Sequence, residues 1–187
     1  GERMNQLLQE VEEMLNRETD YRIEAANYAR VRSELSSDTR YLVPRVHEKY
    51  CTSRILALDY MTGERIDSDT VKNLPQDRRN HLGQALLDLY LRELFCMGRV
   101  QTDAHIGNFL VAVSPDITNE PDRVVLLDFG AIREFSPEFL ASYAGLVQAT
   151  FNEDRGLVVQ KGTELGFLKS CDPEDVHREF YEFCRLV

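Results

Sequence analysis

Three polar side chains in the middle of the sequence have types suited to holding a hard cation and moving a proton. Asp103 and Asn108 are separated by four residues in the polar stretch 101–108, and Asp128 follows the hydrophobic run 124–127. Carboxylate and amide oxygens are the ligands that Mg²⁺ prefers. Asp128 and Asn108 would then bind metal ions that neutralise phosphate oxygens, while Asp103 would orient or deprotonate an attacking hydroxyl. These residue types therefore favour metal-assisted phosphoryl transfer.

Two short strands are expected to bring these residues together. The apolar runs 109–113 and 124–127 have the length of strands, and a turn-rich linker over 114–122 separates them. Asn108 directly precedes the first strand, and Asp128 directly follows the second. A strand pair of this kind is a rigid mount that would hold both side chains at one end.

The rest of the chain is predicted to be mostly helical. Apolar residues recur at helical spacing over several segments, and Gly98 follows the strongest of them as a stop signal. The chain also contains an extended segment before Pro44 and a β-rich stretch over 54–60. The expected fold is α+β, mostly helical, with helices over 2–16, 20–35, 78–97, 137–151, 153–165 and 173–186.

Composition excludes several classes of protein. With 22 basic and 32 acidic residues among 187, the formal charge is −10, so bulk electrostatics repel nucleic acid and give no attraction to anionic lipid. No apolar run approaches the roughly 18 residues of a membrane helix. The four cysteines form no CxxC pair, which argues against a disulfide framework or a thiolate zinc site. A reducing, cytoplasmic location is therefore expected.

The polar loops and several neighbouring words resemble one family. Asp103 and Asn108 have the spacing of the protein-kinase catalytic loop, and Asp128-Phe129-Gly130 matches the kinase metal-binding loop. Further short sequence motifs resemble those of the UbiB family of atypical kinases and occur in the same order; that family is tied to ubiquinone biosynthesis. They are Glu18-Thr19-Asp20-Tyr21, Glu24-Ala25-Ala26-Asn27, Val43-Pro44-Arg45-Val46, Met61-Thr62-Gly63-Glu64, Gln101-Thr102-Asp103 and Leu126-Leu127-Asp128-Phe129-Gly130-Ala131.

The resemblance implies a fold and an activity. It implies a protein-kinase-like C-terminal lobe in which a short β pair carries the catalytic and metal-binding loops. Residues 1–187 would form a single domain, with the helix-C region over 1–36 and the C-lobe over 37–187. The activity implied is phosphoryl transfer or ATP hydrolysis with ATP and Mg²⁺ as cofactors.

The resemblance also assigns roles to individual residues. Asp103 and Glu24 would be catalytic, with Glu24 pairing with the lysine that binds ATP. Glu18 and Asp20 would lie near the phosphates, although helix capping is the ordinary role for such residues. Asn108 and Asp128 would hold the metal.

Parts of a complete kinase are missing from this sequence. Lys49 is the first lysine and lies after Glu24, and no GxGxxG motif is present. We therefore expect a fragment that is itself inactive, whose longer parent is the enzyme. A helical pattern begins about ten residues after Asp128 with no Ala-Pro-Glu motif, which favours a small-molecule or lipid substrate over a protein.

Two other functions remain open on the sequence alone. One is a non-catalytic scaffold that responds to nucleotide or lipid. The other is a metal-dependent hydrolase using Asp103, His105 and Asp128, because imidazole and carboxylates suit transition metals. The partners considered are quinone-biosynthesis enzymes and a membrane contacted peripherally. Nucleic acid is not expected as a partner, and the oligomeric state is open.

Overall fold

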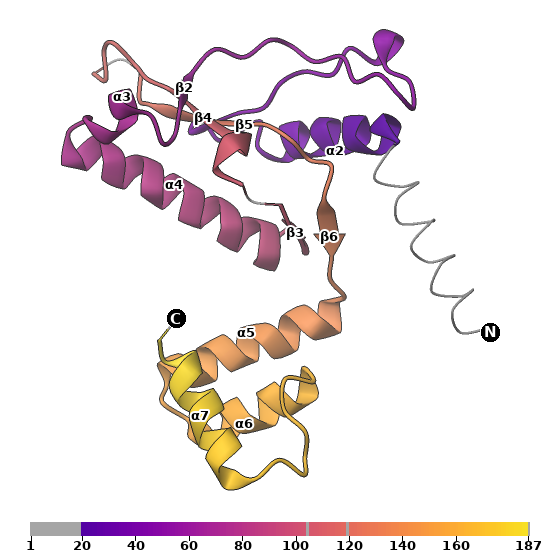
Figure 1. The fold of residues 1–187 in the computed structure, drawn as a ribbon, viewed down its shortest axis with the longest axis vertical. Helices are drawn as coiled ribbons and strands as arrows, with labels where there is room; N and C mark the ends of the chain where they lie inside the picture. Colours follow the sequence, from indigo (N-terminus) through magenta and orange to yellow (C-terminus); the bar gives the residue numbers. More distant parts are fainter. Residues whose placement is uncertain (1–19, 104, 119, 187) are drawn as a thin grey trace. The chain divides into compact units, whose positions relative to one another are not determined.

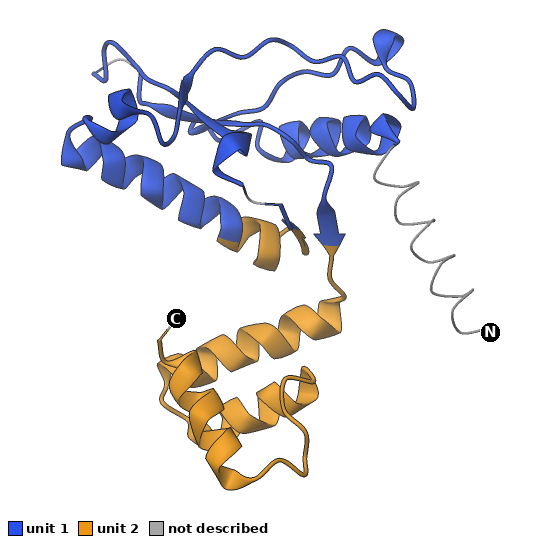
Figure 2. Cartoon of the chain, in the orientation of Figure 1, with its two compact units in different colours: residues 1–90, 101–133 blue, residues 91–100, 134–187 orange. Residues whose placement is uncertain are grey.

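The structure is a computed structural model that describes residues 20–103, 105–118 and 120–186. The chain divides into two compact units (Figure 2), one formed by residues 1–90 and 101–133 and the other by residues 91–100 and 134–187. The predicted helix over 2–16 and the predicted site residue Glu18 lie outside the described residues. The single domain over 1–187 stays a prediction.

A four-stranded sheet in the first unit carries the two polar loops (Figure 1). Its order is β1 (Tyr41–Leu42), β5 (Arg123–Leu126), β4 (Phe109–Ala112) and β2 (Glu64–Arg65). β4 and β5 are antiparallel, with Phe109 opposite Leu126, and the Leu127 amide donates to the Asn108 carbonyl at 2.9 Å. Both loops therefore emerge from one end of this pair, which confirms the predicted mount.

Helices α2 (Tyr21–Glu34), α3 (Asp69–Lys72) and α4 (Gln76–Phe95) complete this unit, which includes α4 as far as Tyr90. Apolar side chains from the sheet and α2 form its core, because each contributes residues that are at most 2% exposed. The Tyr41 hydroxyl donates to the Ala85 carbonyl at 2.7 Å and so ties β1 to α4. The buried set includes Val111, Val124, Val125, Phe129, Tyr28 and Val31.

The second unit is a helical cluster of α5 (Pro137–Phe151), α6 (Arg155–Glu164) and α7 (Glu174–Cys184). Side-chain caps begin the first two helices, because Ser136 accepts from the Phe139 amide and Asp154 accepts from the Leu157 amide. The core of the cluster contains Leu146, Ala149, Val158 and Tyr181. The predicted helices agree with these bounds to within two residues.

Some short elements were not predicted. Gly98 has φ +68°, a left-handed turn that leads from α4 into β3 (Arg99–Gln101). β3 pairs with β6 (Ile132–Glu134), and the division between the units runs through both strands. Strands of three residues are too short to show a periodicity. The 3₁₀ turns η1 (Glu48–Tyr50) and η2 (Ile106–Asn108) were missed for the same reason.

The stretch 54–60 is extended without being a regular strand, so the predicted β-rich segment is only partly right. It meets the preceding segment through the isolated bridges Val46–Leu58 and Thr52–Ile55. Between these bridges the Ala57 amide donates to the Cys51 sulfur at 3.3 Å instead of to a carbonyl. A thiol in the ladder interrupts its backbone pairing, and an irregular hairpin results.

Candidate active site

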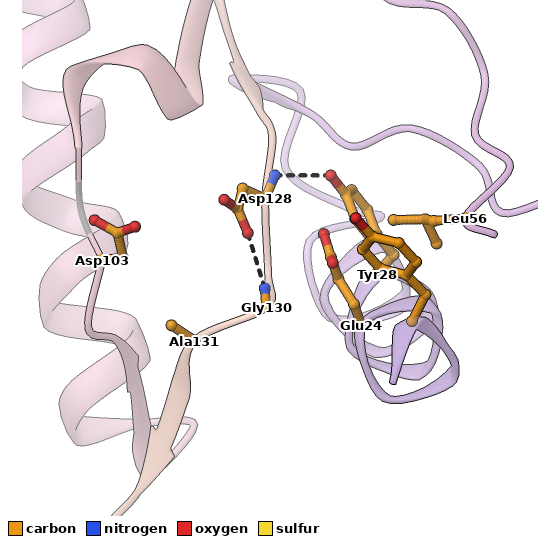
Figure 3. A pocket seen from close by; sticks show the side chains of 8 residues that line it. Glu24, Tyr28, Leu56, Asp103, Asp128, Gly130 and Ala131 are labelled. Carbon is orange, nitrogen blue, oxygen red and sulfur yellow. Dashed lines mark hydrogen bonds between the residues drawn. The ribbon is translucent and has the colours of Figure 1, made fainter. Parts of the chain in front are cut away.

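A cavity of about 800 Å³ in the first unit collects the chemistry predicted from the sequence (Figure 3). Helix α2 forms one wall, and the polar loops that follow β3 and β5 contribute the others. Three predicted site residues, Glu24, Asp103 and Asp128, face this space together. Its full lining is Tyr21, Glu24, Tyr28, Leu56, Asp103, Asp128, Gly130 and Ala131.

Asp128 has an unusual backbone that is held from several directions. Its φ is +66°, in the left-handed region that costs a non-glycine residue about 1–2 kcal/mol. Its amide donates to the Tyr28 hydroxyl at 2.7 Å, and its carbonyl accepts from Gln101 Nε2 at 2.5 Å. Its own Oδ1 accepts from the Gly130 amide at 2.9 Å (Figure 3). Together these bonds fix the direction of the Asp128 carboxylate.

One face of α2 holds the segment after β5. Residues 24, 27 and 28 are spaced i, i+3 and i+4, so their side chains share one side of the helix. Asn27 Nδ2 donates to the Phe129 carbonyl at 2.8 Å, and the Glu24 carboxylate accepts a backbone hydrogen bond from Phe129. The Tyr28 ring packs edge-on against the Phe129 ring, with centroids 4.8 Å apart. The Asp-Phe-Gly segment is therefore attached to α2 by three side chains on one face of the helix.

Three carboxylates, those of Glu24, Asp103 and Asp128, share the cavity without a basic side chain among the described residues that line it. Burial raises the pKa of Glu24, and the charge of Asp128 raises it further. Burial also raises the pKa of Tyr28 to about 12, so its phenol stays neutral at physiological pH. The like charge of Asp128 disfavours the ionised form of Glu24, and a cation in the cavity would relieve this cost.

The loop before β4 is held by its own side chains. Asn108 Nδ2 donates to the Asp103 carbonyl at 3.0 Å, which leaves the amide oxygen of Asn108 for another partner. The Thr102 amide and hydroxyl both donate to the Ala131 carbonyl, at 2.8 and 3.0 Å. These bonds connect the loop to the segment that follows Asp128.

Among the described residues, two other predicted site residues, Asn108 and Asp20, do not line the cavity. Asn108 is the last residue of η2 and directly precedes β4. Asp20 caps α2, accepting from the Arg22 amide at 3.0 Å and pairing with the Arg22 guanidinium at 2.7 Å. Those contacts are the structural role considered for Asp20 from its sequence position.

The geometry gives the hydrolase alternative no support. The Gly107 amide donates to His105 Nδ1 at 2.9 Å, so this nitrogen is engaged within its own loop. Within residues 20–103, 105–118 and 120–186, no group of three or more His, Cys, Asp or Glu side chains could hold a metal ion. A site built on Asp103, His105 and Asp128 is therefore not formed there.

Comparison with known proteins identifies the family. The ABC1 atypical kinase-like domain matches residues 1–162. The chain belongs to the ABC1 atypical kinase-like family. It is 39% identical over 177 residues to rat "Atypical kinase COQ8B, mitochondrial", covering 93% of this chain and 32% of that protein. It is 30% identical over 168 residues to Caenorhabditis elegans "Atypical kinase coq-8, mitochondrial", covering 88% and 22%. The UbiB-type resemblance is thereby confirmed.

A solved structure has a similar fold. The solved complex of Rv3197 with erythromycin from Mycobacterium tuberculosis superposes with a TM-score of 0.75 at 23% identity, covering 96% of this chain and 43% of that one. The mostly helical, kinase-like α+β fold predicted from the sequence is confirmed. The chain spans about a third or less of the curated relatives described above. In its described part, no helix has the length and apolarity needed to cross a bilayer.

Sequence reasoning missed two side chains of this candidate site. Tyr28 lies in the predicted helix over 20–35 but was given no role, and Gln101 was named only as part of a family motif. Both bond to the backbone of Asp128. The i, i+3, i+4 spacing of Glu24, Asn27 and Tyr28 is a signal that could have located one of them, since it places three polar groups on one helical face.

Proposed function

We propose that this chain is the C-lobe portion of an Mg²⁺- and ATP-dependent atypical kinase or ATPase that supports ubiquinone biosynthesis. The observation that carries the proposal is the cavity in which Asp103, Asp128 and Glu24 meet beside the β4–β5 end. Family membership supports the kinase class, and the names of the COQ8 relatives support the biosynthetic assignment.

The donor groups present fit magnesium. Asp128 offers a carboxylate whose direction is set by the Gly130 amide, and Asn108 offers an amide oxygen because its nitrogen is already used. Both are hard oxygen ligands of the kind that Mg²⁺ takes from proteins. When bound, the ion would neutralise charge on the nucleotide phosphates.

The remaining residues take up positioning and proton transfer. Asp103 faces the cavity and would orient the acceptor hydroxyl or water and accept its proton. Glu24 would pair with a lysine supplied by the part of the longer protein that precedes this chain. That pairing would neutralise the carboxylate that now faces Asp128, and the isolated chain would be inactive without it.

The acceptor is proposed to be a small molecule, a lipid or water. Helix α5 begins at Pro137, nine positions after Asp128. The segment between them is therefore too short to offer much extended chain for pairing with a peptide substrate. Quinone-biosynthesis enzymes are the proposed protein partners. Because the COQ8 relatives are named as mitochondrial, we propose the same organelle in place of the cytoplasm, with peripheral membrane contact.

The test uses the longer protein that contains this chain. Asp128→Asn should lower ATP turnover by at least about 100-fold. This is the size of loss that follows when an enzyme loses one preorganised group that stabilises charge in the transition state. Asp67→Asn is the matched control, because Asp67 is an exposed carboxylate paired with Arg65. Unchanged turnover in Asp128→Asn would overturn the assignment. Nucleotide binding without any turnover in the wild type would indicate the non-catalytic scaffold instead.

A further inference from the structure

Tyr28 combines two separate contacts with the Asp-Phe-Gly segment. Its ring packs on the ring of Phe129, and its hydroxyl accepts from the amide of Asp128. We propose that the Tyr28 hydroxyl is a positioning group that holds the Asp128 backbone in its left-handed, metal-directing conformation. This inference rests on the proposed function, because it concerns the residue assigned to the metal.

The backbone conformation of Asp128 requires an external support. A left-handed non-glycine residue persists only when its surroundings over-determine it. At Asp128 the support comes from opposite sides, since Tyr28 binds the amide and Gln101 binds the carbonyl. Among residues 20–103, 105–118 and 120–186, Glu153 is the other non-glycine residue with positive φ, and it lies in the second unit.

Burial makes the hydroxyl contact specific. Tyr28 is 2% exposed, so water competes poorly for the Asp128 amide. The hydrogen bond is part-buried, so an Asp128 amide without its acceptor would be left poorly paired, and the chain would relieve this by rotating about Asp128. Such a rotation would carry the carboxylate away from the cavity. The hydroxyl therefore acts on the metal ligand through the backbone.

Tyr28→Phe tests the contribution of the hydroxyl separately from that of the ring. The phenylalanine keeps the edge-on packing against Phe129, so the fold should persist. Tyr90→Phe is the matched control, since Tyr90 is an exposed helical tyrosine in α4 that does not line the cavity. Asp128→Asn is the reference for loss of the metal ligand.

The experiment follows Mn²⁺ binding to the chain by paramagnetic broadening at the Asp128 amide, together with amide hydrogen exchange. Tyr28→Phe should weaken Mn²⁺ binding by about 2- to 10-fold and accelerate exchange at Asp128 by a similar factor, the range expected for one hydrogen bond. Tyr90→Phe should leave both unchanged. Urea unfolding should show similar global stability in the two variants. If the hydroxyl had a purely structural role, weaker Mn²⁺ binding would instead be accompanied by lower global stability.

Two failures are distinguishable. If Asp128→Asn abolishes the broadening while Tyr28→Phe leaves binding and exchange unchanged, the positioning role is wrong and the metal role of Asp128 stands. If Asp128→Asn leaves the broadening intact, the proposed metal role itself is wrong. A second measurement needs no variant: a small temperature coefficient of the wild-type Asp128 amide proton would support the hydrogen bond, and a large one would contradict it.

Discussion

Glu24 is a half-buried carboxylate that faces the charge of Asp128 in the candidate site. Burial and the neighbouring Asp128 both raise its pKa above the ordinary value of 4.5. A carboxyl group with a raised folded-state pKa binds more protons when folded than when unfolded. Stability therefore falls as pH rises from that ordinary value through the folded-state pKa, and the full cost of charging Glu24 is present above it.

We predict that Glu24→Gln stabilises the isolated chain at neutral pH. The melting temperature should rise by about 1–3 °C at pH 7, and the gap from wild type should shrink as the pH is lowered toward 4.5. Differential scanning calorimetry across this range measures it. Glu48→Gln, at an exposed position of η1, should show no such trend. A gap that does not vary with pH would contradict the explanation.

The same substitution should act in the opposite direction on activity. In the longer protein, Glu24 is proposed to pair with a lysine, so a neutral glutamine would weaken that pair. A residue that destabilises the fold while serving catalysis is common where sites hold buried charge.

The parts of the site that could be predicted are those whose residues lie close together in the sequence. Asp103 and Asp128, which line the cavity, and Asn108, which does not, were singled out because local spacing and flanking strands mark them. The contacts of Tyr28 and Gln101 with Asp128 were not, because they join residues 100 and 27 positions apart. Local pattern contains no information about which side chain meets a given backbone group after folding. Asp20 was assigned to the phosphates by resemblance, whereas its contacts are those of a helix cap.

At the scale of elements, a buried ion pair connects α4 to the linker between β4 and β5. Arg78 donates to both oxygens of Asp122, at 2.7 and 2.5 Å, and also to the Ser114 carbonyl at 2.9 Å. The Asp122 side chain is 2% exposed and accepts from the Ser114 amide as well. The Arg78 guanidinium holds the pKa of Asp122 below its ordinary value. This linker was expected as a simple turn, and its anchoring depends on a partner 44 residues away.

Asp122→Ala should destabilise the chain by about 3–5 kcal/mol, because it leaves a partly buried guanidinium without its partner. Urea unfolding at pH 7 measures the loss. Asp67→Ala removes an exposed partner of Arg65 and should cost less than about 1 kcal/mol. Since the pKa of Asp122 is lowered, its contribution is present above the ordinary value and is lost as pH falls through the folded-state pKa. Equal effects of the two variants would contradict the anchoring role.

Elements with long periodic patterns were predicted well, whereas short ones were not. α4 and the three helices of the second unit were found because each repeats its apolar face over several turns. β3, β6 and the two 3₁₀ turns are three residues each, and tertiary pairing decides such elements. The hairpin near 54–60 was misjudged because the Cys51 sulfur replaces a carbonyl in its ladder.

For the whole molecule, two helical glycines should respond oppositely to alanine. At Gly162 in α6, an added Cβ would lie 2.6 Å from Phe180 Cε1 of α7, within the second unit. At Gly83 in α4, nothing lies within 4 Å of the added atom. The first glycine is therefore required by packing between helices, and the second is not.

We expect Gly162→Ala to destabilise the second unit by about 1–3 kcal/mol through overpacking. Gly83→Ala should stabilise the first unit by about 0.5–1 kcal/mol, because alanine loses less backbone entropy in a helix. Residue-resolved amide exchange, with urea unfolding as the global measure, assigns each change to its unit. Stabilisation by Gly162→Ala would show that α6 and α7 are not packed as described.

The attachment of α2 to the Asp-Phe-Gly segment also constrains synthesis. Asn27 and Phe129 are 102 residues apart, so α2 leaves the ribosome long before its partner is made. At about 5–20 residues per second, the delay is roughly 5–20 seconds. During this interval Tyr28 and Val31, which end up 2% exposed, have no sheet to pack against. The helix that completes the candidate site thus waits through the synthesis of about a hundred residues before its partner is available.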